Sequence, residues 1–201
     1  MKKFILQTVL PIMLLSVAVF IIGSSCSSDP PLPTPPALTC DDAEPILEPI
    51  FTTIGNQGNM DLQQHEYKFT SSVDGVICAL GYRSLVQNTP FFVFNTQEVY
   101  TLEIVEGNGH SVSQSFSSTQ IEYANLPSEF TVTAGTEYTI RRTGGDGLNS
   151  SLGYVANVPS FPVTQGNITF NSSNFVDTQP GGGGPISNTA IPEIHILFYE
   201  N

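Results

Sequence analysis

Three histidines and eighteen carboxylates are the residues of this chain that could carry chemistry. His65, His110 and His195 stand singly, at no spacing typical of a metal centre or a catalytic pair. The sequence contains no GxSxG elbow, HExxH helix or Walker phosphate loop. Glycoside hydrolysis needs only two carboxylates, but the acids on predicted strands, such as Glu103 and Glu137, occupy polar positions. The sequence therefore predicts no catalytic residue and a non-enzymatic protein.

A ligand site is predicted instead in the polar segment near the C-terminus. Aromatic rings with neighbouring carboxylates suit sugar binding, and the candidates are Tyr154, Phe161, Phe175, Asp146 and Asp177. Core packing is the more common use of each aromatic ring. No metal site and no cofactor are predicted. A calcium-supported sugar site is the alternative, with Asp146 or Asp177 as the ligand, although the glycines around Asp146 favour a hairpin turn.

A cysteine follows the apolar stretch Phe4–Ile22, which begins after two lysines and leads into the small residues Gly23–Ser25. This arrangement resembles the lipobox of bacterial lipoproteins, although Gly23 stands where leucine is usual. The resemblance implies export through the secretory pathway, removal of residues 1–25 as a signal peptide, and fatty acylation (such as palmitate) of Cys26. An uncleaved membrane helix is the alternative, because the stretch is about long enough to span a ~30 Å hydrocarbon layer.

The lipoprotein interpretation also predicts a location. Two or more acyl chains hold a protein stably on a membrane. Ser27, as the second mature residue, resembles the sorting position of outer-membrane lipoproteins, so we expect the outer membrane or the cell surface. The proline-rich run Asp29–Pro36 favours an extended spacer. The predicted organisation is a signal peptide over residues 1–25, an anchored spacer over 26–39 and one domain over 40–201.

The charge of the chain limits its partners. It has 6 basic and 18 acidic residues and a formal net charge of −12. Two lysines belong to the predicted signal peptide, which leaves Lys68, Arg83, Arg141 and Arg142. So few cations cannot form the positive face that nucleic acid requires. We expect the membrane, through the lipid anchor, and a glycan or protein ligand as partners.

Cys40 and Cys78 form an even pair once Cys26 carries lipid. An oxidising compartment would allow them to form a disulfide, which we favour. Cys78 lies in an apolar run, so a small buried thiol is the alternative. A bridge would attach the segment after the spacer to the core.

Hydrophobic periodicity predicts an all-β fold with little helix. Apolar and polar residues alternate with period two at residues 65–69, 99–105, 111–116, 129–133 and 137–140. Residues 193–200 are apolar on both faces, which indicates a strand covered on both sides. A short helix over Asp41–Phe51 is limited by Pro45 and Pro49. These patterns predict an antiparallel β-sandwich, jelly-roll-like or related.

The segment from Gly144 to Ile191 has a different character. It is rich in glycine, asparagine and serine, and shows one clear strand at Asn167–Phe170. A segment of this length is predicted to be a functional loop or a surface crossover.

The order of motifs resembles a bacterial family of extracellular β-sandwich domains of unknown function. The matching segments are Tyr67–Phe69, Asp74–Ile77, Leu80–Tyr82, Tyr100–Ile104, Phe130–Tyr138 and Pro192–Phe198. The resemblance implies a β-sandwich of the kind found beside carbohydrate-active or adhesive modules, and it transfers no catalytic residue.

The sequence thus predicts a non-enzymatic surface or envelope lipoprotein that binds an extracellular glycan or partner protein. A structural or assembly subunit of the cell envelope is the alternative, and a small glycoside hydrolase comes third.

Overall fold

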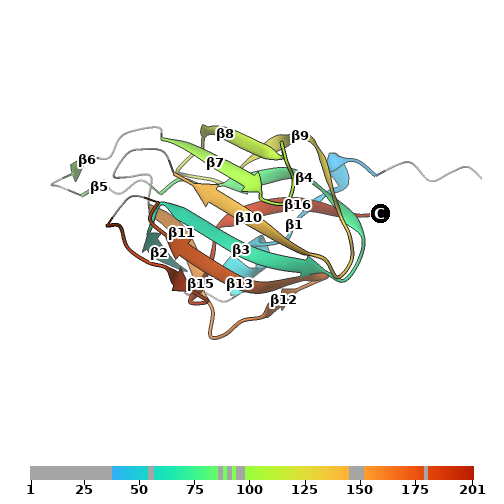
Figure 1. Ribbon diagram of the computed structural model, residues 1–201. Coiled ribbons are helices and arrows are strands. Elements are labelled where there is room, and N and C mark those ends of the chain that lie inside the picture. The colour runs from blue at the N-terminus through green and yellow to red at the C-terminus, as the bar shows by residue number, and fades with distance from the viewer. Residues whose placement is uncertain are drawn as a thin grey trace, which may run out of the picture. The chain divides into compact units, whose positions relative to one another are not determined.

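The computed structural model describes residues 38–53, 57–85, 88–89, 92–93, 98–144, 152–178 and 181–201. Within these ranges the protein is nearly all β, with antiparallel sheets packed against one another (Figure 1). The predicted all-β sandwich is therefore confirmed. The predicted signal peptide and most of the spacer lie outside the described residues. No helix of the described part is long and apolar enough to cross a membrane.

A four-stranded sheet forms one layer. Its strands run in the order β1 (Glu44–Pro45), β16 (Ile194–Glu200), β4 (Gly75–Tyr82) and β9 (Glu122–Val132). All neighbours are antiparallel. β4 is buried along its whole length, as its apolar sequence requires.

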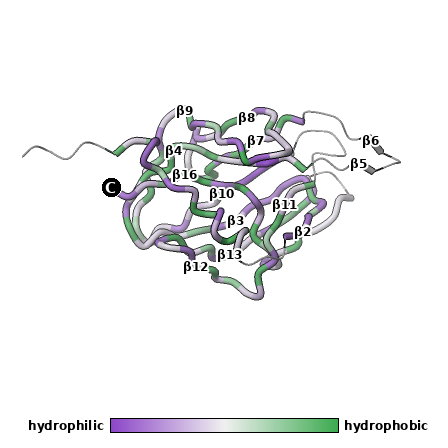
Figure 2. The backbone as a smooth tube through the Cα atoms, turned by 180° about the vertical axis from the view of Figure 1, so that it is seen from behind, coloured by the Kyte–Doolittle hydropathy of each residue, from purple (hydrophilic) through white to green (hydrophobic). Residues whose placement is uncertain are grey.

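A seven-stranded sheet forms the other layer. Its order is β12 (Val163–Gln165), β13 (Ile168–Val176), β3 (Gln64–Ser71), β10 (Glu137–Thr143), β7 (Val99–Ile104) and β8 (Ser111–Ser115), with β14 (Ile186–Ser187) also paired to β13. Buried and more exposed residues alternate along β3 and β7, and hydrophobic and hydrophilic residues are interspersed along the chain (Figure 2). The alternation places one face of the sheet on the core and the other in water.

The remaining elements are short. A three-stranded sheet has the order β15 (Ala190–Pro192), β11 (Leu152–Asn157) and β2 (Gln57–Asp61), and β5 (Asn88–Thr89) pairs with β6 (Phe92–Val93). Instead of one helix over Asp41–Phe51, the chain forms η1 (Cys40–Asp42), β1 and α1 (Glu48–Thr53). Pro45 lies in β1, in keeping with its poor fit inside a helix.

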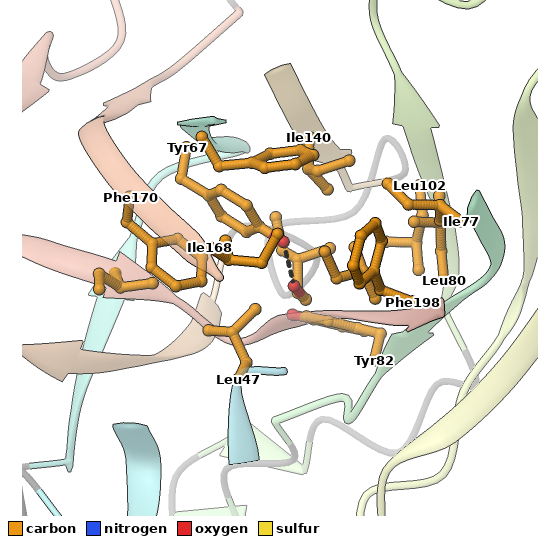
Figure 3. Packing of buried hydrophobic residues seen from close by; sticks show 14 of the residues in the cluster. Leu47, Tyr67, Ile77, Leu80, Tyr82, Leu102, Ile140, Ile168, Phe170 and Phe198 are labelled. Atoms are coloured by element: carbon orange, nitrogen blue, oxygen red, sulfur yellow. Dashed lines mark hydrogen bonds between the residues drawn. The ribbon is translucent and has the colours of Figure 1, made fainter. Parts of the chain in front are cut away.

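The main core lies between the two large sheets (Figure 3). Tyr67 and Phe170 of the seven-stranded sheet pack edge to face at 5.2 Å between ring centroids. The hydroxyl of Tyr67 donates a hydrogen bond of 2.8 Å to the carbonyl oxygen of Ile194, which joins the layers. Burial raises the pKa of Tyr67 well above its usual value, because the phenolate would be deprived of water.

A second apolar cluster covers the outer side of the four-stranded sheet. Val76, Cys78, Ala79 and Tyr199 are buried there, with Cys40 packed against them. Cys40 and Cys78 form a disulfide with their Cα atoms 5.7 Å apart. Both the favoured bridge and the two-sided cover of the last strand are thus confirmed. The bridge attaches η1 to the wholly buried strand β4.

The segment from Gly144 to Ile191 differs from the expected loop or crossover. Its described residues include β11, β12, β13, β14 and β15. Along β13 the buried residues are Ile168, Phe170, Ser173 and Phe175, because a register shift between Phe170 and Ser172 interrupts the alternation. The strand predicted at Asn167–Phe170 is the first part of β13, and the bulge interrupts the period-two pattern in the rest of this strand.

Candidate binding surface

The outer face of the seven-stranded sheet is polar. In Figure 1 this face is turned to the viewer, and no described element lies across it. Strand β3 directs His65, Tyr67 and Phe69 to the inside and leaves Glu66 and Lys68 on the outside. β7 shows the same alternation, and β10 leaves Glu137 and Arg141 more exposed than Tyr138, Ile140 and Arg142. The face is therefore a surface of fixed strands that carry polar side chains.

One line of polar residues crosses this face at right angles to the strands. The register pairs Ser187 with Asn174, Asn174 with Glu66, Glu66 with Arg141, and Arg141 with Glu103. We call these five residues the polar row. They come from β14, β13, β3, β10 and β7, so segments distant in the sequence supply adjacent members.

Hydrogen bonds join the polar row from end to end. Ser187 Oγ donates to Asn174 Oδ1 at 3.1 Å, and Asn174 Nδ2 donates to Glu66 Oε1 at 3.3 Å. Arg141 then donates from Nε to Glu66 Oε2 at 2.9 Å and from Nη1 to Glu103 Oε1 at 3.2 Å. Because each side chain is held by its neighbours, the row presents its polar atoms in a fixed arrangement.

Glu66 is the central acceptor of the row. Its side chain is 14% exposed and also receives a 3.3 Å hydrogen bond from Gln64 Nε2. Burial opposes the charge on Arg141, but the hydrogen bonds and charges of Glu66 and Glu103 outweigh burial and raise its pKa. The Arg141 guanidinium is thus a permanent cation between two carboxylates.

Further polar groups flank the row. The carboxylate of Glu137 forms an ion pair with Lys68 Nζ at 3.3 Å and accepts a hydrogen bond from Asn171 Nδ2 at 3.0 Å. Both carboxylate oxygens of Glu106 accept from Thr139, through its backbone N–H and its hydroxyl, at 2.8 Å each. With the row, this face offers amide, hydroxyl, guanidinium and carboxylate groups that both donate and accept hydrogen bonds.

Tyr154, a residue predicted to bind ligand, lies elsewhere, on β11. The guanidinium carbon of Arg83 lies 4.3 Å from the centroid of the Tyr154 ring. Arg83 therefore covers one face of this ring, and that face is not open for stacking on a sugar. The side chain is half-buried.

Arg83 is itself held by a buried carboxylate. Its Nε and Nη2 donate to the two oxygens of Glu193 at 3.1 and 2.8 Å, and the Glu193 side chain is 2% exposed. His195 Nε2 lies 3.9 Å from Glu193 Oε1, and neither ring nitrogen of His195 has a hydrogen-bond partner among the described residues. His195 is fully buried, packed near the rings of Phe51 and Tyr123.

Phe161 and Phe175 both contribute to packing. Phe161 is partly buried against the main core. Phe175 is fully buried, with its ring 5.0 Å from the ring of His65. This burial corrects the expectation of an exposed aromatic ring at position 175, because Phe175 lies on the inner face of β13 after the bulge.

Asp177 closes a turn of the backbone. Its carboxylate accepts from the backbone N–H groups of Gly183, at 2.7 Å, and of Gln63, at 3.1 Å. These bonds occupy both oxygens. Within the described ranges, no group of three or more histidine, cysteine, aspartate or glutamate residues is placed to hold a metal ion. Asp146 and Cys26 lie outside the described residues.

The four predicted residues that the structure describes thus have separate packing or turn roles, and the structure shows a polar row that the sequence did not indicate. The only sequence signal was the alternation that placed polar residues on one face of each strand. Their alignment across five strands depends on the register, which the alternation does not specify.

No family model matches this chain, and no curated protein matches its sequence. The resemblance to extracellular β-sandwich domains stays a prediction.

Proposed function

We propose that this protein is a lipid-anchored surface or envelope protein whose β-sandwich binds an extracellular glycan or partner protein. The observation that carries the proposal is the polar row. Hydrogen-bonding side chains that hold one another in place lose little freedom when a ligand binds, and this preorganisation favours binding.

The proposed attachment rests on the sequence. Residues 1–25 would be removed as a signal peptide, and Cys26 would carry the lipid, at the outer membrane or cell surface. The disulfide supports this environment, because structural disulfides form in oxidising compartments. Cys40 lies close after the predicted spacer, so a membrane anchor at Cys26 would be connected to β4 through the bridge.

We propose binding rather than catalysis because of how the carboxylates on this face are used. Glu66 and Glu103 both accept from Arg141, and Glu137 pairs with Lys68. These carboxylates are thus already engaged with cations of the same face, whereas glycoside hydrolysis needs two carboxylates that act on the substrate.

The test is a glycan-array screen of the full chain, produced with its own leader and extracted in detergent. Saturable binding to a glycan supports the proposed function. A pull-down from the cell envelope, followed by titration of the purified partner, tests the protein-ligand arm. If both give no saturable binding from folded protein, the structural-subunit alternative replaces the proposal. Metabolic labelling with a fatty-acid analogue, in wild type and Cys26→Ala, tests the anchor separately.

A further inference from the structure

Building on the proposed function, we propose that the ligand is a neutral, hydroxyl-rich polysaccharide that lies across the strands along the polar row. The row lies on a face that no described element crosses (Figure 1). The register places Asn174, Glu66, Arg141 and Glu103 on consecutive strands.

The spacing of the strands indicates that the polysaccharide lies across them, along the row. Neighbouring strands lie about 4.8 Å apart, so the row from β14 to β7 extends over roughly 19 Å. Evenly spaced polar groups over this length suit a polymer of repeated units better than a single small molecule. The hydrogen bonds of the row connect side chains across the strands. The ion pair between Lys68 of β3 and Glu137 of β10 also runs between neighbouring strands, beside the row.

The neutral character follows from the charges on the face. Four carboxylates (Glu66, Glu103, Glu106 and Glu137) stand against two cations (Lys68 and Arg141), and both cations are already paired with carboxylates. An anionic polysaccharide would meet a face of its own sign. A cationic ligand would have to displace Arg141 from Glu66, whose side chain is only 14% exposed.

Sugar hydroxyl groups match the hydrogen-bonding groups of the polar row. Each sugar hydroxyl donates one hydrogen bond and accepts others, so it can bond a carboxylate or amide oxygen and an adjacent N–H group at once. A protein partner is less well matched, since the centres of protein interfaces are rich in aromatic residues and depleted in charges. The members of the polar row are a hydroxyl, an amide and three charged side chains.

The experiment measures the affinity of the full chain, in detergent, for three probes. Two are neutral, a β-glucan and a mannan, and the third is the anionic polygalacturonate. The row variants are Glu66→Gln and Asn174→Ala. Glu137→Gln is the matched control on the same face, and Tyr154→Ala tests the aromatic residue predicted from the sequence. Circular dichroism and the thermal midpoint establish that each variant folds. If Glu66→Gln does not fold, the affinity of Asn174→Ala decides the test.

We expect binding to a neutral probe that weakens about tenfold in the row variants, as for the loss of one hydrogen bond to a charged group. Glu137→Gln should change the affinity less than about twofold, in the range of an exposed polar group. Stronger binding of polygalacturonate, or neutral binding that only Tyr154→Ala weakens, would overturn this inference and leave the proposed function in place. Absence of binding to any glycan would remove the glycan arm of the proposed function itself.

Discussion

Arg83 and Glu193 form an ion pair through two parallel hydrogen bonds of 3.1 and 2.8 Å, next to the fully buried His195. The register pairs Tyr82, the last residue of β4, with Ile194, the first residue of β16, so Arg83 and Glu193 face each other one residue beyond these strand ends. The carboxylate of Glu193 is thus compensated inside the protein rather than by water.

Removal of Arg83 should therefore destabilise the fold. In Arg83→Met the carboxylate of Glu193, 2% exposed, loses its cation, and we expect the free energy of unfolding to fall by about 3 kcal/mol. Urea denaturation measures the change. The matched control is Lys68→Met, whose ion pair with Glu137 is 48% and 45% exposed and should contribute about 0.5 kcal/mol or less. Equal losses in the two variants would contradict this account of Glu193.

The disulfide should contribute strongly to stability. Cys40 and Cys78 are 38 residues apart in the sequence, and a cross-link over such a loop stabilises by about 4 kcal/mol in the chain-entropy model. The double variant Cys40→Ala/Cys78→Ala should lose an amount of this order in urea denaturation. Reduction of the wild type should give a similar loss and leave the double variant unchanged. An effect of the reductant on the double variant would show that it acts elsewhere.

Gly81 should not accept a side chain. A Cβ atom at this position would lie 2.6 Å from the ring of Tyr123 and 3.1 Å from Cβ of His195. We expect Gly81→Ala to lower the free energy of unfolding by about 1–3 kcal/mol, the usual range for overpacking. In a Tyr123→Ala background the same substitution should cost less, because the ring is gone. An equal cost in both backgrounds would rule out the ring as the cause.

Alkaline pH should destabilise the protein through its buried tyrosines. Burial raises the pKa of Tyr67 well above 10.0 and that of Tyr123 to about 12. The folded state therefore holds protons that the unfolded state releases above pH ~10, and stability falls as the pH rises beyond that value. The free energy of unfolding at pH 8 and pH 11 measures this slope. Tyr67→Phe should reduce the slope, and an unchanged slope would exclude Tyr67 as a source.

The fold could largely be predicted from the sequence, because many strands have one solvent-exposed face and therefore alternate polar with apolar residues. Period-two alternation located β3, β7, β8 and β10, and the two-sided apolar pattern located β16. Only the start of β13 was predicted, as the strand at Asn167–Phe170, since the bulge shifts the buried positions from Phe170 to Ser173. β11 has no clear alternation, because its buried residues are Gly153, Val155 and Ala156, and the position of Gly153 against His65 is a tertiary contact.

The site was harder to predict, for a physical reason. The sequence counted Arg142 among the four basic residues of the domain without indicating its environment. It is fully buried, with its guanidinium 4.7 Å from the ring of Tyr100 and a 3.0 Å hydrogen bond to the Leu152 carbonyl oxygen. Arg141, next to it, is outward and belongs to the polar row. The two residues differ only in the face of β10 that each occupies, and their partners come from strands distant in the sequence.

The most direct test of the central claim is side-chain NMR of Arg141 during titration with a neutral glycan. The structure contains a matched internal control, because Arg83 Nε is also bonded to a carboxylate but lies away from the row. We predict that the Arg141 Nε–H and Asn174 side-chain amide signals shift saturably, while the Arg83 Nε–H signal stays in place. A saturable shift of the Arg83 signal with an unchanged Arg141 signal would contradict binding along the polar row.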